Sequence, residues 1–215
     1  MKKLFLIVVA VMLASMSAMA QIPANIQEVL KKCDEKMDNP AGMVIDMAVK
    51  TKILVISLNG TAKMYQKGDK YFNEMTVKAA GHEMRTEQGF DGQQEWDYTT
   101  AVKKSERDTL TITKTSKAKN NDCNIDFDFD KMYKSAKMKE KGLYYEISFS
   151  DRIDPEAPKK MSVKIAKSNY NMREVSFSEG PARITLTVTK ITIGARDSMF
   201  KLDMNRYKNA VVVRK

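Results

Sequence analysis

The chain lacks the sequence features by which most enzymes are recognised. It has one histidine and two cysteines, and it contains no CxxC pair, no HExxH sequence, no glycine-rich phosphate loop and no paired metal-ligand spacing. These absences make thiol exchange an unfavoured reaction. They predict a protein that binds its ligand without turnover, with neither a cofactor nor a metal ion.

The single histidine, His82, follows an Ala80-Gly81 turn. A general base at this position stays an alternative, but no nucleophile or orienting group lies at a recognisable spacing from it. The sequence favours a solvent-facing turn residue.

An acidic run suggests calcium as a second kind of chemistry. It consists of Asp122, Asp126, Asp128 and Asp130, and phenylalanines separate the last three aspartates. The run lacks the glycine and the final glutamate of a calcium-binding loop. We therefore favour aspartates that point outward while the phenylalanines point inward.

Long apolar runs are also missing, except at the very start of the chain. Lys2 and Lys3 precede an apolar run over residues 4–14, and Ala18-Met19-Ala20 supplies a small-x-small cleavage site. This pattern predicts a signal peptide over residues 1–20 and one soluble domain over residues 21–215. Cleavage would expose Gln21, which cannot accept the lipid that a cysteine accepts, so we expect a protein free in the periplasm, with secretion less favoured.

The expected mature chain is moderately basic. Without Lys2 and Lys3, 35 basic residues oppose 27 acidic ones, a net charge of +8. Export argues against nucleic acid and makes anionic lipid head groups or acidic glycans the available partners. Solubility alone is an equally good explanation of this charge.

The two cysteines, Cys33 and Cys123, leave two interpretations open. An oxidising compartment permits a disulfide between them, worth about 4 kcal/mol for a loop of this length. The alternative is a pair of buried thiols that act as small apolar residues.

Residues 22–37 have the apolar spacing of one amphipathic helix, with Pro23 in its first turn and an end near Asn39-Pro40. The period then changes to two, with a turn expected at Asn59-Gly60 and further turns at about ten-residue intervals. This pattern predicts an antiparallel meander with one apolar and one wet face. A change of phase between Ile184 and Ile193 predicts a β-bulge near Lys190, so the sheet should curve into a partial barrel.

Residues 116–141 interrupt the hairpins. A polar stretch precedes a short helical pattern with Asp130 as N-cap before Met132, Tyr133, Ala136 and Met138. Two helices and a sheet with one apolar face predict an α+β fold in which helices cover the concave side. Twelve of the 16 methionines lie beyond the expected leader, and they suit either an adaptable lipid site or ordinary core packing.

Three segments in order resemble the LolA-like outer-membrane lipoprotein carrier family. They are GTAKMYQKGDKYFNEM at 60–75, DGQQEWDYT at 91–99, and MFKLDMNRYKNAVVVRK at 199–215. The resemblance implies a curved, unclosed antiparallel half-barrel whose helices cover an apolar concave face that receives acyl chains. It also implies an inner-membrane donor, an outer-membrane acceptor and a monomeric carrier, with a regulatory or sensing module as the alternative.

On this resemblance, residues 125–138 form a candidate lid, and Trp96 and Tyr98 face the cavity unless they fill an ordinary core. The expected ligand-binding residues are Met64, Met75, Trp96, Tyr98, Phe127, Phe129, Met132, Tyr133, Tyr145, Ile147, Phe149, Phe177 and Leu186. Lys67 is the gating candidate, at a turn where the family commonly has an arginine. Lysine lacks the planar fork of donors, and Asp97 replaces a common aromatic residue, so both positions depart from the family pattern.

Overall fold

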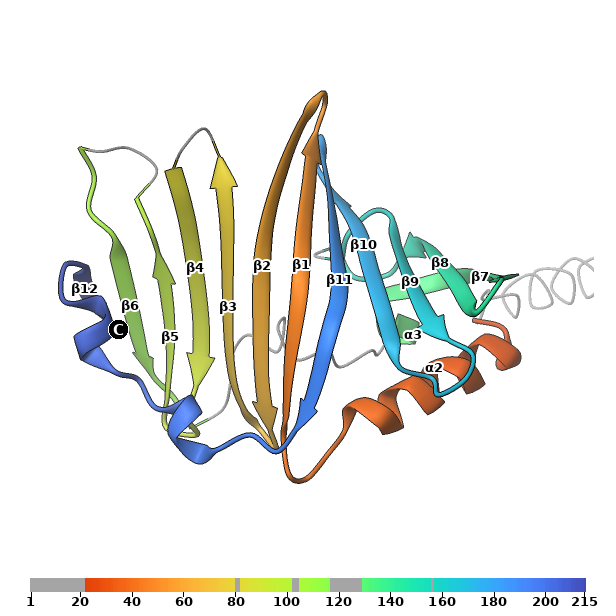
Figure 1. The fold of residues 1–215 in the computed structure, drawn as a ribbon, viewed down its shortest axis with the longest axis horizontal. Helices are drawn as coiled ribbons and strands as arrows, with labels where there is room; N and C mark the ends of the chain where they lie inside the picture. Colours follow the sequence, from red (N-terminus) through yellow and green to blue (C-terminus); the bar gives the residue numbers. More distant parts are fainter. Residues whose placement is uncertain (1–21, 80–81, 102–104, 117–128, 156) are drawn as a thin grey trace, which may run out of the picture.

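A single 12-stranded, unclosed and curved sheet forms the framework of the computed structural model (Figure 1). The structure describes residues 22–79, 82–101, 105–116, 129–155 and 157–215. The strand order is β12-β6-β5-β4-β3-β2-β1-β11-β10-β9-β8-β7, and every pair is antiparallel except β12 with β6. The strands are β1 Met43–Ile53, β2 Ile56–Lys67, β3 Lys70–Ala79, β4 His82–Phe90, β5 Gln94–Thr99, β6 Thr109–Lys114, β7 Tyr133–Lys141, β8 Tyr144–Arg152, β9 Met161–Ala166, β10 Met172–Glu179, β11 Ala182–Ile193 and β12 Val211–Arg214. The α+β half-barrel expected from the sequence is confirmed.

The N-terminal helix is confirmed as α2, Ala24–Met37. It begins directly after Pro23, whose carbonyl accepts the first helical hydrogen bonds from Ile26 and Gln27. It ends before Asn39-Pro40, because proline disfavours helical backbone in the residue that precedes it.

One large core lies between α2 and the sheet. The apolar side of the helix, with Ile26, Leu30 and Cys33, packs on β1 and on strands β7 to β11. We call this side of the sheet the helix face and define it by Met43, Ile45 and Met47 of β1, which are all buried.

A second core lies on the opposite side of the sheet. Two 3-10 helices, η2 (Asp197–Phe200) and η3 (Met204–Tyr207), place Phe200 and Tyr207 against β3, β5 and β6. We call this side the C-terminal face; on β1 it carries Val44, which alternates with Met43 and Ile45. The expectation of one apolar and one wet face is therefore wrong, because the C-terminal segment covers apolar side chains on the second face.

The β-bulge expected near Lys190 is confirmed within one residue. In the pairing of β1 with β11, Asp46 lies opposite Lys190 and Met47 opposite Val188, so Thr189 is the extra residue. The Thr189 hydroxyl donates a hydrogen bond of 2.9 Å to the carbonyl of Asp46. The bulge keeps Val188 and Ile191 on the same helix face despite their odd spacing.

The turn predicted at Asn59-Gly60 is wrong. The chain reverses at Leu54 and Val55 instead, and Gly60 lies within β2 opposite Val49 and Val77. A Cβ atom at Gly60 would lie 2.1 Å from the carbonyl oxygen of Thr76, so the glycine serves a close approach of strands here.

The helix predicted from Asp130 through Met138 is also mostly wrong. The structure has one helical turn, α3 (Phe129–Met132), and then strand β7. Tyr133 and Ala136, three residues apart as in a helix, are both buried although they belong to β7, and the ladder with β8 lacks a pair between them, where Asp151 of β8 has a φ of 57°. A strand irregularity thus imitated helical spacing.

Among the described residues, no helix is long and apolar enough to cross a membrane. The expected signal peptide, Cys123 and Phe127 lie outside the described residues. Cys33 carries a free thiol in the core beneath α2, and burial raises its pKa to about 12. Its bridge to Cys123 stays a prediction.

Candidate functional site

The helix face carries a strip of apolar side chains that α2 covers only in part. It crosses five neighbouring strands, because Val175 lies opposite Leu186, Leu186 opposite Val49, and Ala62 opposite both Met47 and Met75. Its less buried members, which we call the apolar strip, are Ala62, Met64, Met75, Val175, Phe177, Ile184 and Leu186. Met75 is 37% exposed, and the others are half-buried.

Gly60 contributes no side chain to this strip. It lies between Val49 and Val77 in register, and the nearby backbone of Thr76 leaves no room for a Cβ atom at this position. The strip is continuous with the core under α2, because Ala62, Met64 and Leu186 pack against that core. The arrangement offers an apolar surface at the border of a covered core.

Most of the predicted ligand-binding residues share this face. Met64, Met75, Phe177 and Leu186 belong to the apolar strip, and Tyr145 is half-buried at the edge of the core. The remaining described members on this face lie deeper, in or against the core; they are Phe129, Met132, Tyr133, Ile147 and Phe149. The rings of Phe129 and Phe149 stack at 4.3 Å between centroids, so the candidate lid segment contacts the sheet through its described end.

Trp96 and Tyr98 do not share that face. Both lie on the C-terminal face, where Trp96 is only 1% exposed and stacks with Phe72 at 6.2 Å between centroids. The hydroxyl of Tyr98 donates a hydrogen bond of 2.6 Å to Asp108, and its ring packs against Tyr207. The expectation that Trp96 and Tyr98 face the acyl-chain cavity is therefore corrected. The motif DGQQEWDYT contributes to the second core, because its period of two directs both aromatic rings toward η2 and η3.

One polar side chain interrupts the apolar strip. Asn73 lies between Met64 and Gln88 on the helix face, and both atoms of its amide are buried without a hydrogen-bond partner among the described residues. Close by on the same face, the Tyr71 hydroxyl donates a hydrogen bond of 2.6 Å to the buried carboxylate of Glu95. A buried, unpaired amide is unfavourable in a folded protein, so this position needs an explanation.

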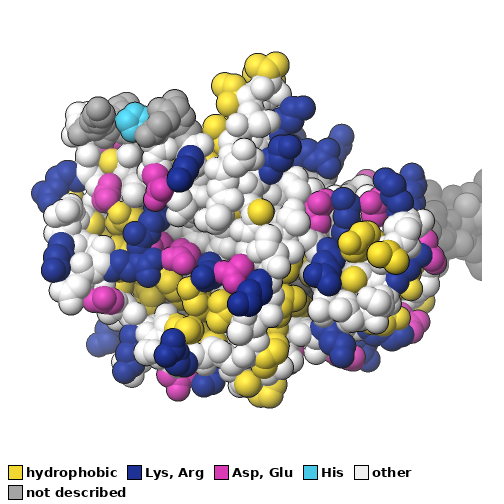
Figure 2. Space-filling model, in the orientation of Figure 1, with side chains coloured by type: hydrophobic (Ala, Val, Ile, Leu, Met, Phe, Trp, Pro, Cys, Tyr) yellow, Lys and Arg dark blue, Asp and Glu magenta, His cyan; other side chains and the backbone are white. Residues whose placement is uncertain are grey.

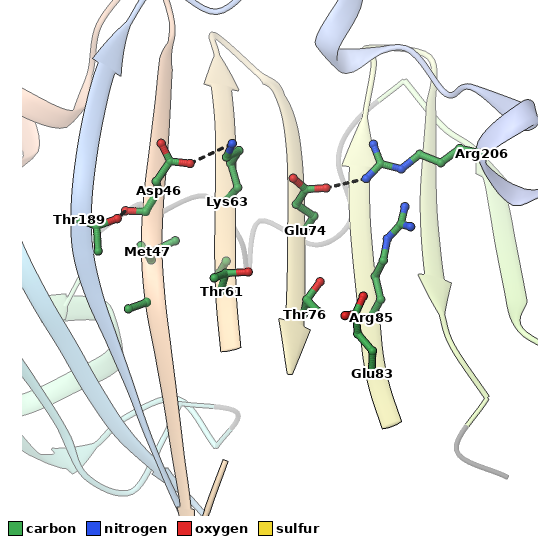
Figure 3. A pocket seen from close by; sticks show the side chains of 12 residues that line it. Asp46, Met47, Thr61, Lys63, Glu74, Thr76, Glu83, Arg85, Thr189 and Arg206 are labelled. Carbon is green, nitrogen blue, oxygen red and sulfur yellow. Dashed lines mark hydrogen bonds and ion pairs between the residues drawn. The ribbon is translucent and has the colours of Figure 1, made fainter. Parts of the chain in front are cut away.

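The C-terminal face has a pocket of its own, of about 500 Å3 (Figure 3). Its charged walls come from β1 to β4 and from η3, and Figure 2 shows acidic and basic side chains crossing this region. Lys63 pairs with Asp46 at 3.0 Å, and Arg206 pairs with Glu74 at 2.5 Å. Because these charges neutralise each other, the pocket has no marked preference for a cation or an anion.

A buried carboxylate anchors the C-terminal segment beside this pocket. The Glu87 carboxylate accepts a hydrogen bond of 2.8 Å from Arg206, and it also accepts hydrogen bonds from Arg85 and from the Tyr207 hydroxyl. Burial, followed by the hydrogen bond with Glu87, raises the pKa of Tyr207. The sequence reasoning missed this cluster, because Tyr207 and Glu87 are 120 positions apart and no local pattern joins them.

The gating candidate contacts the C-terminal segment. Lys67 donates a hydrogen bond of 3.0 Å to Asp197 at the start of η2, and this bond lowers the pKa of the Asp197 carboxyl. No hydrogen bond or ion pair joins Lys67 to the described part of the candidate lid, residues 129–138.

The remaining chemical candidates stay separate. His82 is exposed at the first position of β4, as expected of a turn residue. In the described parts of the chain, no cluster of three or more histidine, cysteine or acidic residues could hold a metal ion. Three of the four calcium candidates, Asp122, Asp126 and Asp128, lie outside those parts.

Comparison with known proteins gives similarity at the level of the fold. No protein-family model matches the sequence. No curated protein matches it either. Among solved structures, an uncharacterized conserved protein from Thermus thermophilus superposes with a TM-score of 0.53 and 12% identity, over 89% of this chain and 99% of that chain.

Two further structures are less similar. A LolA superfamily protein from Nitrosomonas europaea gives a TM-score of 0.40 at 14% identity, over 82% of this chain and 97% of that one. The Pseudomonas aeruginosa MucA/MucB complex gives 0.45 at 6% identity, over 84% of this chain and 62% of that one. At these identities the similarity concerns the fold alone.

Proposed function

We propose that the protein is an exported carrier that receives the acyl chains of a lipoprotein or lipid on the apolar strip and delivers them to the outer membrane. One observation carries the proposal: the apolar strip on the helix face is continuous with the core and remains partly uncovered. The ordered resemblance of the three sequence segments to lipoprotein carriers agrees with this use.

Hydrophobic burial would supply the affinity. Each buried methylene contributes about 0.8 kcal/mol, so one long acyl chain gains on the order of 10 kcal/mol before the costs of ordering. A lysine near an anionic head group contributes about 1 kcal/mol. Basic charge can therefore orient the cargo, but the apolar strip must hold it.

The amide of Asn73 would meet the polar end of the cargo. An acyl chain ends in an ester or an amide. Either group offers an oxygen that can accept a hydrogen bond from the Asn73 side-chain N–H, and a cargo amide can also donate its N–H to the Asn73 side-chain oxygen. Asn73 lies at the border between Met64 and the polar region that contains Gln88. This placement gives the strip a polar end as well as an apolar wall.

A carrier must also release its cargo. The half-buried state of Leu186 and the exposure of Met75 leave an acceptor access to the chain. The proposal therefore includes an inner-membrane donor and an outer-membrane acceptor, a monomeric periplasmic carrier, and no role for nucleic acid, a cofactor or turnover. Loss of a native activity on His82→Ala would argue for an enzyme instead.

Lipid extraction tests the proposal. Protein isolated from its native envelope is extracted with organic solvent, and the extract is examined by mass spectrometry; uptake of a fluorescent fatty acid is measured in parallel. We expect acylated species and uptake, with uptake reduced at least tenfold by Met75→Glu and unchanged by the matched Thr76→Glu on the opposite face. Neither acylated species nor uptake would contradict the proposal.

The second candidate is a regulatory module that binds lipid but passes it to no acceptor. The charged pocket on the C-terminal face favours it, because that pocket offers a partner a surface separate from the apolar strip. A transfer assay with labelled lipoprotein and acceptor membranes distinguishes the two functions. A carrier moves the label, whereas a sensor retains it.

A further inference from the structure

The tip of the β1–β2 hairpin exposes three apolar side chains in succession. Leu54 is 76% exposed, Val55 94% and Ile56 59%. The hairpin projects beyond the ends of its neighbours, and hydrophobic side chains occupy its tip in the space-filling view (Figures 1 and 2). These side chains take no part in either core, so folding does not explain them.

The turn chemistry points the same way. Ile53 pairs with Ile56, which leaves Leu54 and Val55 as a two-residue loop. Such loops favour Asn-Gly or Asp-Gly, because they need positive φ angles that glycine and asparagine adopt without strain. Leu54 has a φ of 53°, an unfavourable conformation for leucine. Strained positions of this kind concentrate at functional sites.

Basic side chains flank the tip on one side. Lys52 lies opposite Arg183, and Lys50 lies opposite Asn59, whose other neighbour is Lys78. Register places all four basic residues on the C-terminal face of the sheet, at the end nearest the tip. All four are exposed, and none forms an ion pair with a described carboxylate.

We propose that the β1–β2 hairpin inserts Leu54, Val55 and Ile56 into the head-group region of an anionic membrane while Lys50, Lys52, Lys78 and Arg183 contact its phosphates. Three side chains form too small a patch for a stable protein interface, which buries about 1,000 Å2 or more. A second copy would bring the same positive charge toward the tip. An anionic bilayer fits both the apolar tip and the unpaired basic groups.

Vesicle sedimentation tests this membrane contact. The protein is produced with its own N-terminal segment, purified from the envelope fraction and checked by intact mass. It is then mixed with vesicles of phosphatidylglycerol and phosphatidylethanolamine, or of phosphatidylcholine alone. We expect preferential binding to the first composition, weakened by salt, and a loss of about fivefold for each of Lys50→Gln and Lys52→Gln, which corresponds to about 1 kcal/mol per basic residue.

The decisive variant is Leu54→Asn/Val55→Gly/Ile56→Thr, which removes the apolar tip and places asparagine, a residue that tolerates a positive φ, at position 54. We expect at least a tenfold weaker partition into anionic vesicles. Leu143→Asn is the matched control, because Leu143 is also 76% exposed, in the turn between β7 and β8, and it should change nothing. In a separate variant, Val55→Trp, the tryptophan fluorescence should shift to shorter wavelength when anionic vesicles are added, while the contribution of buried Trp96 stays constant.

Two results would overturn the membrane contact. The first is equal sedimentation of the triple variant and the unchanged protein with anionic vesicles. The second is a triple variant that sediments normally but has a different oligomeric state, as measured by light scattering, since the tip would then contact a second copy. Met75→Glu should sediment normally. Failure of the membrane contact is thereby distinguished from failure of acyl-chain binding.

Discussion

At the residue scale, two buried polar side chains on opposite faces of the sheet, Glu87 and Asn73, differ in their hydrogen bonding. On the C-terminal face, the Glu87 carboxylate is fully paired with Arg206, Tyr207 and Arg85. On the helix face, the amide of Asn73 has no described partner. The first arrangement holds a segment in place, and the second costs stability that a ligand could recover.

Replacing Asn73 by leucine should therefore stabilise the protein without ligand. Removing an unpaired buried amide relieves a desolvation cost of about 1–3 kcal/mol, and leucine has a similar volume. Urea unfolding of Asn73→Leu should show a higher free energy of unfolding, whereas Asn59→Leu, at an exposed position of β2, should change little. A clear loss of stability in Asn73→Leu would show that the amide is satisfied in the folded protein.

Replacing Glu87 by glutamine should have the opposite effect. The change leaves Arg85 and Arg206 without their buried counter-charge, which costs about 3 kcal/mol in comparable pairs. Glu74→Gln removes the more exposed partner of the same Arg206 and should cost less than about 1 kcal/mol. Equal losses in the two variants, measured by urea unfolding, would contradict the anchoring role of Glu87.

At the scale of elements, local signals succeeded where the chain's own pattern decides the structure. Helix α2, the turn at Lys67 and the bulge near Lys190 were all anticipated, because proline, glycine and a change of phase act within a few residues. The prediction of a turn at Asn59-Gly60 was wrong because the glycine serves instead to accommodate the close approach of the Thr76 backbone. Strand β7 failed because pairing with β8 prevailed over a helical spacing.

Helix α2 should protect the Cys33 thiol. The thiol is buried, and burial raises its pKa to about 12, so both access and thiolate formation are limited. In a Cys123→Ser background, a thiol reagent should modify native Cys33 at least about 100-fold more slowly than the urea-unfolded chain, because modification requires local opening. Leu30→Ala should speed the reaction, while Lys31→Ala, on the exposed side of α2, should not. Fast modification of the native protein would mean that α2 leaves the sheet readily.

At the scale of the whole molecule, the sheet is covered on both sides, by α2 on one and by the C-terminal segment on the other. The period of two places Trp96 and Tyr98 on a common face but carries no information on which element covers that face. The covering segment, residues 195–210, has only two one-turn helices and no regular apolar period. Local sequence patterns therefore could not predict that the expected binding residues lie on two different faces of the sheet.

Both covers depend on tyrosines that are buried in their neutral form. Burial raises the pKa of Tyr98 and Tyr133 to about 12 and also raises that of Tyr207. Because the folded-state pKa values exceed the ordinary value of 10.0, this stabilisation is complete below about pH 10 and is lost as the pH rises toward 12. Urea unfolding with tyrosinate absorbance should show this alkaline decline. Tyr98→Phe should make the decline shallower, and tyrosines that all ionise near pH 10 in the folded protein would contradict it.

Photo-crosslinking from neighbouring residues tests the acyl-chain proposal most directly. A photoreactive amino acid is placed at Met75, on the helix face, or at Thr76, on the C-terminal face, and each protein is irradiated with a radiolabelled acylated lipopeptide. We expect a strong adduct from position 75 and little or none from position 76. Equal labelling at both positions, or labelling from position 76 alone, would contradict the assignment of the cargo to the apolar strip.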